Sequence, residues 1–249
     1  MSPLTLLRFS LGSIVMVAAA VVFMVLMLFL LPWRALRLKT CNYYGKIVGR
    51  TVLACAGARP VIHNRQRLHD AFPAIYVSNH TSTLDMWMGM WLCPVGGGGI
   101  AKKEIMRIPG IGQLYFLSGH PLIDRSNRER AIATMNKMAR FMKKHRLGLW
   151  IWPEGTRSMT GELGPFKKGF VHAALATEMP IVPIVVWNAT RIWPRGRTRF
   201  QPGDLHIEVL PAIQTTDWTQ DTVLEHVDQV RQAFVTCLAQ PSPELRDAP

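Results

Sequence analysis

The 249-residue chain combines strong basicity with an apolar composition, since its formal charge is +13 and 49% of its residues are hydrophobic. Nucleic-acid-binding proteins are basic but rarely this apolar, and the sequence has neither an RNP-like aromatic signature nor zinc-finger spacing, so we expect no nucleic-acid partner. A lipid bilayer, with its anionic surface and apolar interior, fits both properties better.

The N-terminal segment has the composition of a membrane helix. The stretch Phe9–Trp33 carries no charge and is long enough to cross a bilayer. A cleaved signal peptide is the alternative, but its apolar core would be shorter and followed by small residues, whereas this run ends in bulky residues and then charge. We therefore predict a retained anchor. Arg34, Arg37 and Lys39 follow the anchor and only Arg8 precedes it, which predicts that the following chain is cytoplasmic.

A second, weaker apolar segment covers Cys41–Ala58. It predicts a helix that lies at the membrane interface, or one that packs on the anchor to form a membrane-embedded hairpin. We divide the chain into an anchor with its interfacial helix over residues 1–59, a globular domain over residues 60–240, and a Pro-rich, disordered tail over residues 241–249. The four cysteines show no CxxC or metal-ligand spacing, which favours reduced thiols.

The globular part has the pattern of an α/β domain. Short apolar runs predict strands over Ala74–Val77, Gly99–Ala101, Gly148–Trp152, Ile181–Trp187 and Leu205–Val209. Apolar residues at helical spacing predict helices over Asn127–Arg146, Lys168–Glu178 and Thr219–Ala239.

The polar turn after the first predicted strand contains His80 and Asp85. Residues five apart in a regular helix point away from each other, so the two can meet only if His80 precedes a helix and Asp85 lies in its first turns. Residues 81–83, a Thr-Ser-Thr run, are suitable caps for that helix. Asp85 could then orient the imidazole, and His80 could act as a general base. By itself, the pair could equally be a histidine that caps a turn.

A second polar segment, Pro153–Ser158, follows another predicted strand. Gly155 allows close approach of the backbone, Thr156 offers a hydroxyl, and Arg157 can form a bidentate contact with a phosphate. The alternative is an ordinary turn with a surface ion pair. Two further cations could meet an anionic head group or simply be solvated, namely Lys102 and Arg125.

Taken together and in order, these segments resemble the conserved blocks of the glycerolipid acyltransferase family, over roughly residues 74–187. The first block, NHxSxxD, is similar to Asn79–Asp85. The second, third and fourth blocks are similar to Ile123–Arg125, Pro153–Ser158 and Ile181–Ile184. Trp152 stands where Phe is usual, a difference that affects the shape of the pocket more than its chemistry.

The resemblance implies a fold and an activity. The fold is a mixed sheet flanked by helices, an α/β architecture with an N-terminal membrane-embedded helical segment. The activity is transfer of an acyl chain from acyl-CoA or acyl-carrier protein to the sn-2 hydroxyl of 1-acyl-glycerol-3-phosphate, which gives phosphatidic acid. The thioester is already activated, so no metal or other cofactor is expected. The expected location is the cytoplasmic face of the inner (plasma) membrane.

The resemblance also implies roles for individual residues. His80 is the general base, and Asp85 orients it. The acceptor phosphate is bound by Arg157 with its neighbours Glu154, Gly155 and Thr156, and further phosphate contacts are expected from Lys102 and Arg125.

Three alternatives remain open from the sequence. The acceptor could be another lysolipid, such as a lyso-ornithine lipid or a lysophospholipid. A lipid or thioester hydrolase would need a nucleophile, and the sequence lacks a G-x-S-x-G elbow. A non-catalytic membrane-binding protein would have no reason to keep His80, Asp85 and Arg157 together.

Overall fold

The computed structural model describes residues 3–107, 111–120, 122–123, 128–194 and 200–241. Its N-terminal half contains α1 (Pro3–Phe29), α2 (Arg34–Cys55), β1 (Ala58–His63), α3 (Arg67–Asp70), β2 (Ile75–Ser78), α4 (Leu84–Leu92), β3 (Gly98–Gly99), β4 (Ala101–Lys102), a 3₁₀ helix (Lys103–Arg107), α5 (Ile111–Ser118) and β5 (Leu122–Ile123). The remainder contains α6 (Arg128–Lys144), β6 (Leu149–Ile151), α7 (Gly169–Leu175), β7 (Ile181–Val186), α8 (Ala189–Ile192), β8 (Gly203–Val209) and α9 (Val223–Leu238).

A mixed sheet forms the centre of the molecule, with six described strands in the order β1-β8-β7-β2-β6-β3. Neighbouring strands are parallel except β7 and β8, which are antiparallel. In the middle of the sheet, Val77 of β2 lies opposite Ile151 of β6 on one side and Pro183 of β7 on the other. A separate parallel pair is formed by β4 and β5.

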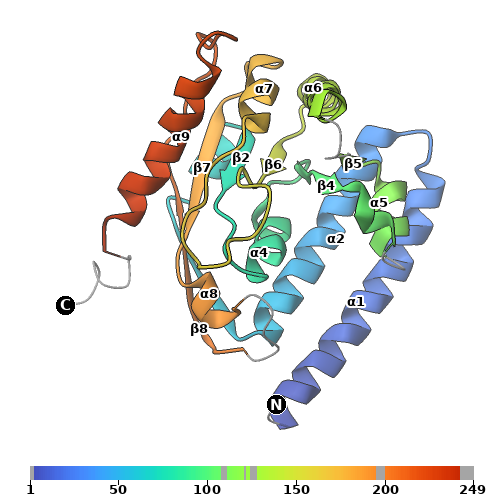
Figure 1. The fold of residues 1–249 in the computed structure, drawn as a ribbon. Helices are drawn as coiled ribbons and strands as arrows, with labels where there is room; N and C mark the ends of the chain where they lie inside the picture. The colour runs from blue at the N-terminus through green and yellow to red at the C-terminus, as the bar shows by residue number, and fades with distance from the viewer. Residues whose placement is uncertain (1–2, 108–110, 121, 124–127, 195–199, 242–249) are drawn as a thin grey trace.

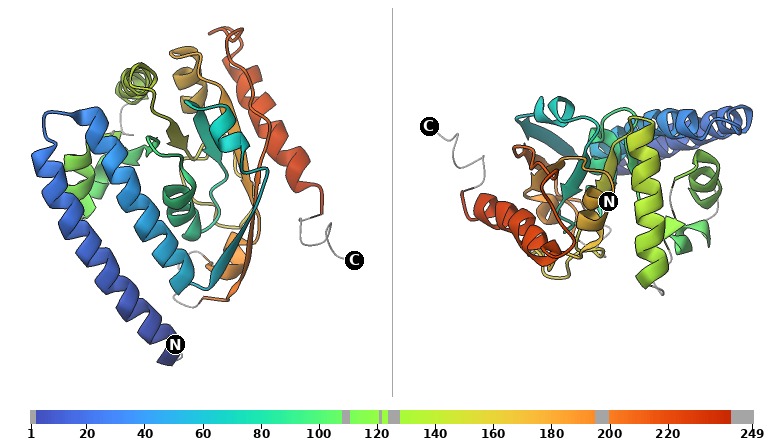
Figure 2. Two further views of the ribbon diagram at one scale, coloured as in Figure 1. Left: turned by 180° about the vertical axis from the view of Figure 1, so that it is seen from behind. Right: turned by 90° about the horizontal axis from the view of Figure 1, so that it is seen from above.

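Helices cover both faces of this sheet, with α4 and α2 on one face and α7 and α9 on the other (Figures 1 and 2). Successive residues of β2 point to opposite faces, so Tyr76 packs in the core on the α4 side and Val77 packs on the α7 side. Because both faces are covered, β2 and β7 are buried along their whole length. This explains why the predicted strands are continuous apolar runs without alternation.

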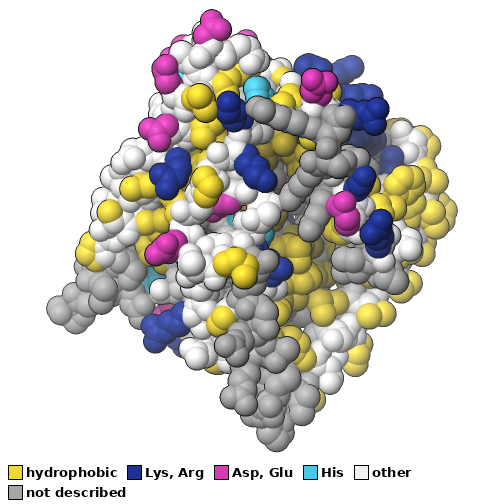
Figure 3. Space-filling model, viewed as in Figure 1, with side chains coloured by type: hydrophobic (Ala, Val, Ile, Leu, Met, Phe, Trp, Pro, Cys, Tyr) yellow, Lys and Arg dark blue, Asp and Glu magenta, His cyan; other side chains and the backbone are white. Residues whose placement is uncertain are grey.

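The two N-terminal helices form an antiparallel hairpin beside the sheet (Figure 1). In the part of α1 that the structure describes in full, Leu7–Phe29 is long and apolar enough to cross a membrane. Side chains on its outer side are exposed, including Ile14 at 66% and Phe29 at 75%. Figure 3 shows hydrophobic side chains gathered over the α1 side of the molecule. The second helix, α2, packs between α1 and α4.

The predicted fold class, an α/β mixed sheet flanked by helices with an apolar N-terminal helix, is confirmed. The segment Gly99–Ala101 is not one strand, because Gly99 pairs with β6 whereas Ala101 pairs with β5. β1 was not predicted, since it contains Pro60 and Arg59 and lies at the edge of the sheet. The division of the chain at residues 59 and 60 stays a prediction, and residues 242–249 of the predicted tail lie outside the described residues.

Candidate active site

The two main polar segments meet because β2 and β6 are adjacent and parallel. The chain leaves β2 into Asn79 and His80, and it leaves β6 into Trp152 and Pro153. The carboxyl ends of neighbouring parallel strands lie at the same edge of a sheet, where α/β proteins commonly bind ligands. The topology therefore places the first and third sequence blocks side by side.

His80 and Asp85 are in contact, as the helix argument predicts. His80 precedes α4, and Asp85 lies in the first turn of that helix. The His80 Nδ1 atom is 3.1 Å from the Asp85 Oδ2 atom. Because a carboxylate only accepts hydrogen bonds, Nδ1 carries the hydrogen in this contact, and the lone pair of Nε2 is left to accept a proton. The His80 side chain is 16% exposed and that of Asp85 is 1% exposed.

Asp85 binds the turn that precedes α4, and Ser82, one of the predicted capping residues 81–83, accepts the N–H of the first helical residue. The Asp85 Oδ2 atom accepts hydrogen bonds from the main-chain N–H groups of Thr81 at 2.6 Å and Ser82 at 2.7 Å. The Ser82 hydroxyl accepts one from the Leu84 N–H at 3.1 Å. Among the described residues, Thr83 makes no capping hydrogen bond. The two main-chain hydrogen bonds therefore fix the position of the Asp85 carboxylate that contacts His80.

Residues that follow β6 hold the main chain of His80 from the other side. The His80 N–H donates to the Glu154 Oε1 atom at 3.0 Å, and the Ser158 N–H donates to the His80 carbonyl oxygen at 2.8 Å. The Trp152 ring stacks on the His80 ring with 5.0 Å between their centroids. These contacts of Trp152 and Ser158 were not predicted, because they depend on the pairing of two strands that are far apart in sequence.

Asn79 extends the pairing of β2 with β7 beyond the end of the strand. Its side-chain Oδ1 atom accepts a hydrogen bond from the Val186 N–H at 2.9 Å, and its Nδ2 atom donates to the Val186 carbonyl oxygen at 3.0 Å. The amide thus replaces a main-chain partner at the point where the backbone of His80 leaves the sheet.

Arg157 connects the third block to the first, because its Nη1 atom donates a hydrogen bond to the Thr83 hydroxyl at 2.6 Å. Gly155 has a φ of +71°, in the left-handed region that favours glycine. A hollow of about 410 Å³ lies beside this loop, and its lining residues are Glu154, Thr156, Arg157, Ser158, Met159, Gly164, Pro165, Phe166 and Lys167. A volume of this order is enough for a small polar head group.

Glu154 is 6% exposed and sits between this hollow and His80. Burial, with a smaller effect of the Asp85 carboxylate, raises the pKa of Glu154 from 4.5 to about 7, against the lowering effect of the His80 N–H. Within the described residues, the Glu154 Oε2 atom has no hydrogen-bond partner. At neutral pH the group is thus divided between a neutral and a charged form.

Of the remaining two predicted phosphate ligands, the structure describes only the backbone of Lys102, so both stay predictions. The backbone of Lys102 lies in β4 opposite Ile123 of β5, two residues before Arg125 in the chain. Arg125 itself lies outside the described residues. Among the residues that are described, no group of three or more His, Cys, Asp or Glu side chains could hold a metal ion.

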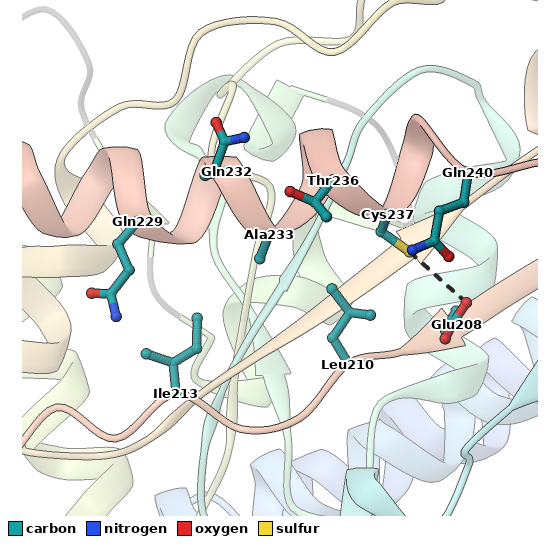
Figure 4. A pocket seen from close by; sticks show the side chains of 9 residues that line it. All are labelled: Glu208, Leu210, Ile213, Gln229, Gln232, Ala233, Thr236, Cys237 and Gln240. Carbon is teal, nitrogen blue, oxygen red and sulfur yellow. Dashed lines mark hydrogen bonds between the residues drawn. The ribbon is translucent and has the colours of Figure 1, made fainter.

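A second hollow, of about 550 Å³, lies between α9 and the chain from β8 to Ile213 (Figure 4). It is lined by Glu208, Leu210, Ile213, Gln229, Gln232, Ala233, Thr236, Cys237 and Gln240. None of the predicted site residues is among these lining residues.

Comparisons with known proteins identify the family of the chain. A family model described as Acyltransferase matches residues 59–187, which contain every predicted site residue. The chain is 40% identical to a 1-acyl-sn-glycerol-3-phosphate acyltransferase of Limnanthes douglasii, over 89% of this chain and 78% of the relative. It is 35% identical to an Escherichia coli protein of the same name, over 70% of each chain.

Among solved structures, the chain resembles the LPA acyltransferase PlsC from Thermotoga maritima. The TM-score is 0.65 at 21% identity, over 96% of this chain and 99% of the other, which shows a shared fold that includes the N-terminal hairpin region. The family model covers more than half of the chain, and the relatives align well beyond it. The chain therefore belongs to the acyltransferase family and is an enzyme of that class.

Proposed function

We propose that this enzyme transfers an acyl chain from an acyl thioester to the sn-2 hydroxyl of 1-acyl-glycerol-3-phosphate, with phosphatidic acid as the product. The observation that carries the proposal is the contact between the buried Asp85 and His80, which leaves the His80 Nε2 atom as a proton acceptor. The names of the relatives, in plants and in bacteria, supply the substrate class.

In the proposed mechanism, His80 accepts the proton of the sn-2 hydroxyl as that oxygen attacks the carbonyl carbon of the thioester. Asp85 stabilises the imidazolium that forms, as the acid does in a serine-protease triad. The carbon–sulfur bond then breaks, and the departing thiolate takes the proton from His80. The acyl group ends as an ester of the acceptor, and the donor is released as a free thiol.

The hollow beside Gly155 supplies the proposed phosphate site. Arg157 and Lys167 contribute positive charge to its lining, and Thr156 contributes a hydroxyl. Glu154 lines the same hollow. A guanidinium can hold two phosphate oxygens at once, which fixes the acceptor hydroxyl relative to His80. Such positioning lowers the entropic barrier to reaction. Lys102 and Arg125 are proposed as further phosphate contacts.

We place the enzyme at the cytoplasmic face of the inner membrane, where the acceptor and product remain in the bilayer. The exposed apolar side of α1 would enter the membrane, and acyl-CoA or acyl-carrier protein would arrive from the cytosol. The acyl donor is the only further reactant that we propose, with no metal or other cofactor.

The test is an assay of purified enzyme with a panel of acceptors and with both donors, acyl-CoA and acyl-carrier protein. Lysophosphatidic acid should be converted to phosphatidic acid at least tenfold faster than lysophosphatidylcholine or a lyso-ornithine lipid, since the doubly charged phosphate monoester pairs best with the cations Arg157 and Lys167 of the hollow. Faster turnover of another lysolipid would overturn the proposed acceptor. Release of free fatty acid instead of ester would indicate a hydrolase.

A further inference from the structure

Glu154 contacts the main chain of His80, and not its ring. Its Oε1 atom accepts the His80 N–H at 3.0 Å, while the Ser158 N–H donates to the carbonyl oxygen of the same residue at 2.8 Å. Both polar main-chain groups of His80 are thus bonded to the segment that follows β6. The Glu154 side chain is buried, with 6% of its surface exposed.

The His80 N–H needs this acceptor because its own segment offers no alternative. His80 lies between β2 and α4, outside any helix or strand of the described chain. Asn79, one residue earlier, is bonded to Val186, and Thr81, one residue later, is bonded to Asp85. The three residues are therefore bonded to β7, to the turn after β6 and to α4, and Glu154 provides the bond that fixes the His80 N–H.

We propose that Glu154 is a positioning residue, whose carboxyl group fixes the backbone of His80 and so aligns the imidazole between Asp85 and the acceptor hydroxyl. This inference rests on the proposed function. It assigns Glu154 a role that acts through His80, in addition to its place in the lining of the phosphate hollow. A shift of His80 by about 1 Å can lower the rate of an enzyme by about a hundredfold.

The role requires a hydrogen-bond acceptor at this position but no negative charge. A glutamine has the same shape and keeps an oxygen that can accept the His80 N–H. A methionine has a similar length and fills the site, but its thioether sulfur is a weak acceptor. The comparison of Glu154→Gln with Glu154→Met therefore separates the acceptor from the charge and from the volume of the side chain.

The experiment measures kcat and the KM for lysophosphatidic acid, with acyl-CoA as donor, in the wild type and both variants. We expect Glu154→Gln to keep kcat within about threefold of the wild type, and Glu154→Met to lower kcat by about tenfold to a hundredfold. Both variants should keep the KM for lysophosphatidic acid within about threefold of the wild type. A residue that binds the substrate would instead change this KM when it is substituted. Glu162→Met is the matched control, since Glu162 is an exposed carboxylate in the same loop, and it should leave both constants unchanged.

Two outcomes would overturn the inference. A raised acceptor KM in both Glu154 variants, with kcat unchanged, would make Glu154 a phosphate ligand. An equal loss of kcat in Glu154→Gln would show that the negative charge is required and not the hydrogen-bond acceptor. This variant decides the question even if Glu154→Met fails to fold.

Failure of the proposed function can be told apart from failure of this inference, because the wild type would then not acylate lysophosphatidic acid. The variants would in that case be compared on the acceptor that it does use.

Discussion

At the scale of single residues, Asp85 has two tasks that depend on the same oxygen atom. Its Oδ2 atom accepts two main-chain N–H groups in the turn before α4 and also contacts His80. The contact with His80 could be predicted from the sequence because it follows from local helix geometry. The contacts of Glu154, Trp152 and Ser158 with His80 could not, because they require knowledge that β2 and β6 are neighbours.

We expect Arg157 to bind the phosphate of the acceptor and to take no part in the proton transfer. Arg157→Lys keeps the charge but loses the second phosphate contact and the geometry of the bond to Thr83, so we expect the KM for lysophosphatidic acid to rise about tenfold with a smaller change in kcat. Steady-state kinetics with varied acceptor measures this. Arg191→Lys, at an exposed arginine of α8, is the control. An acceptor KM equal to that of the wild type would argue against phosphate binding at Arg157.

The buried carboxyl group of Glu154 should make the stability of the protein depend on pH. Its pKa is raised in the folded protein, so the folded state holds the proton more tightly than the unfolded chain. The contribution of this proton to stability is present below about pH 4.5 and is lost as the pH rises to about 7. Glu154→Gln removes the ionisation, so we expect it to be more stable than the wild type at pH 8 by roughly 3 kcal/mol, and by much less at pH 5.

Thermal unfolding of both proteins at the two pH values, in the same detergent, checks this expectation. The advantage of Glu154→Gln should grow between pH 5 and pH 8. An advantage that is absent at pH 8, or larger at pH 5, would mean that burial does not disfavour the charged form of Glu154.

At the scale of elements, α2 is the helix of the N-terminal hairpin that packs on α4, the helix that carries Asp85. Gly45 and Gly49 face α4, and a Cβ atom on Gly49 would collide with the Trp87 carbonyl oxygen and lie 2.9 Å from the Trp91 Cβ atom. Lys46, between them, donates to the carbonyl oxygens of Trp91 at 3.1 Å and Cys93 at 2.7 Å, at the C-terminal end of α4. The lysine therefore satisfies carbonyl groups that the helix end leaves unpaired.

Gly49→Ala should consequently separate α2 from α4. We expect a loss of about 1–3 kcal/mol in stability, with a lower rate because Asp85 moves with its helix. Thermal unfolding and the acyl transfer assay measure the two effects. Gly99→Ala is the control, since an added Cβ atom there has no neighbour within 4 Å among the described residues. Equal unfolding temperatures for the two variants would show that the close approach of α2 is not required.

The sequence predicted these elements unevenly. The helix prediction Asn127–Arg146 is close to α6 because its apolar residues repeat at helical spacing. The strands around Gly99 were harder to predict, because β3, β4 and β5 have two residues each, too few to show a repeating pattern of apolar residues. The close packing of α2 on α4 depends on tertiary contacts and could not be read from the glycine spacing alone.

At the scale of the whole molecule, the apolar N-terminal helix and the site are parts of one unit. Arg34 and Arg37, the charges that predict the orientation in the membrane, donate to the carbonyl oxygens of Gly119 and Leu117 at the end of α5. These residues thus also hold the hairpin to the globular part. α1 packs on α2, and its outer side remains exposed and apolar.

We predict that this exposed side of α1 binds the membrane. Val17 and Val21 are 64% and 57% exposed, so aspartates there should fold but disfavour entry into a bilayer by roughly 3 kcal/mol each. We expect Val17→Asp/Val21→Asp to lower the partition coefficient for phospholipid vesicles by at least about tenfold, measured by co-sedimentation. Val17→Leu/Val21→Leu is the apolar control. Equal binding of both variants would mean that this side of α1 does not enter the membrane.

The proposed acyl transfer requires His80 as the base that activates the acceptor. The most direct measurement is the rate of phosphatidic acid formation by purified His80→Ala with saturating lysophosphatidic acid and acyl-CoA. His69→Ala, at an exposed histidine of α3, serves as the control. We predict that His80→Ala loses about 10²- to 10⁴-fold in rate while its unfolding temperature stays close to that of the wild type, and that His69→Ala is unaffected. A folded His80→Ala enzyme with the wild-type rate would show that His80 is not the base.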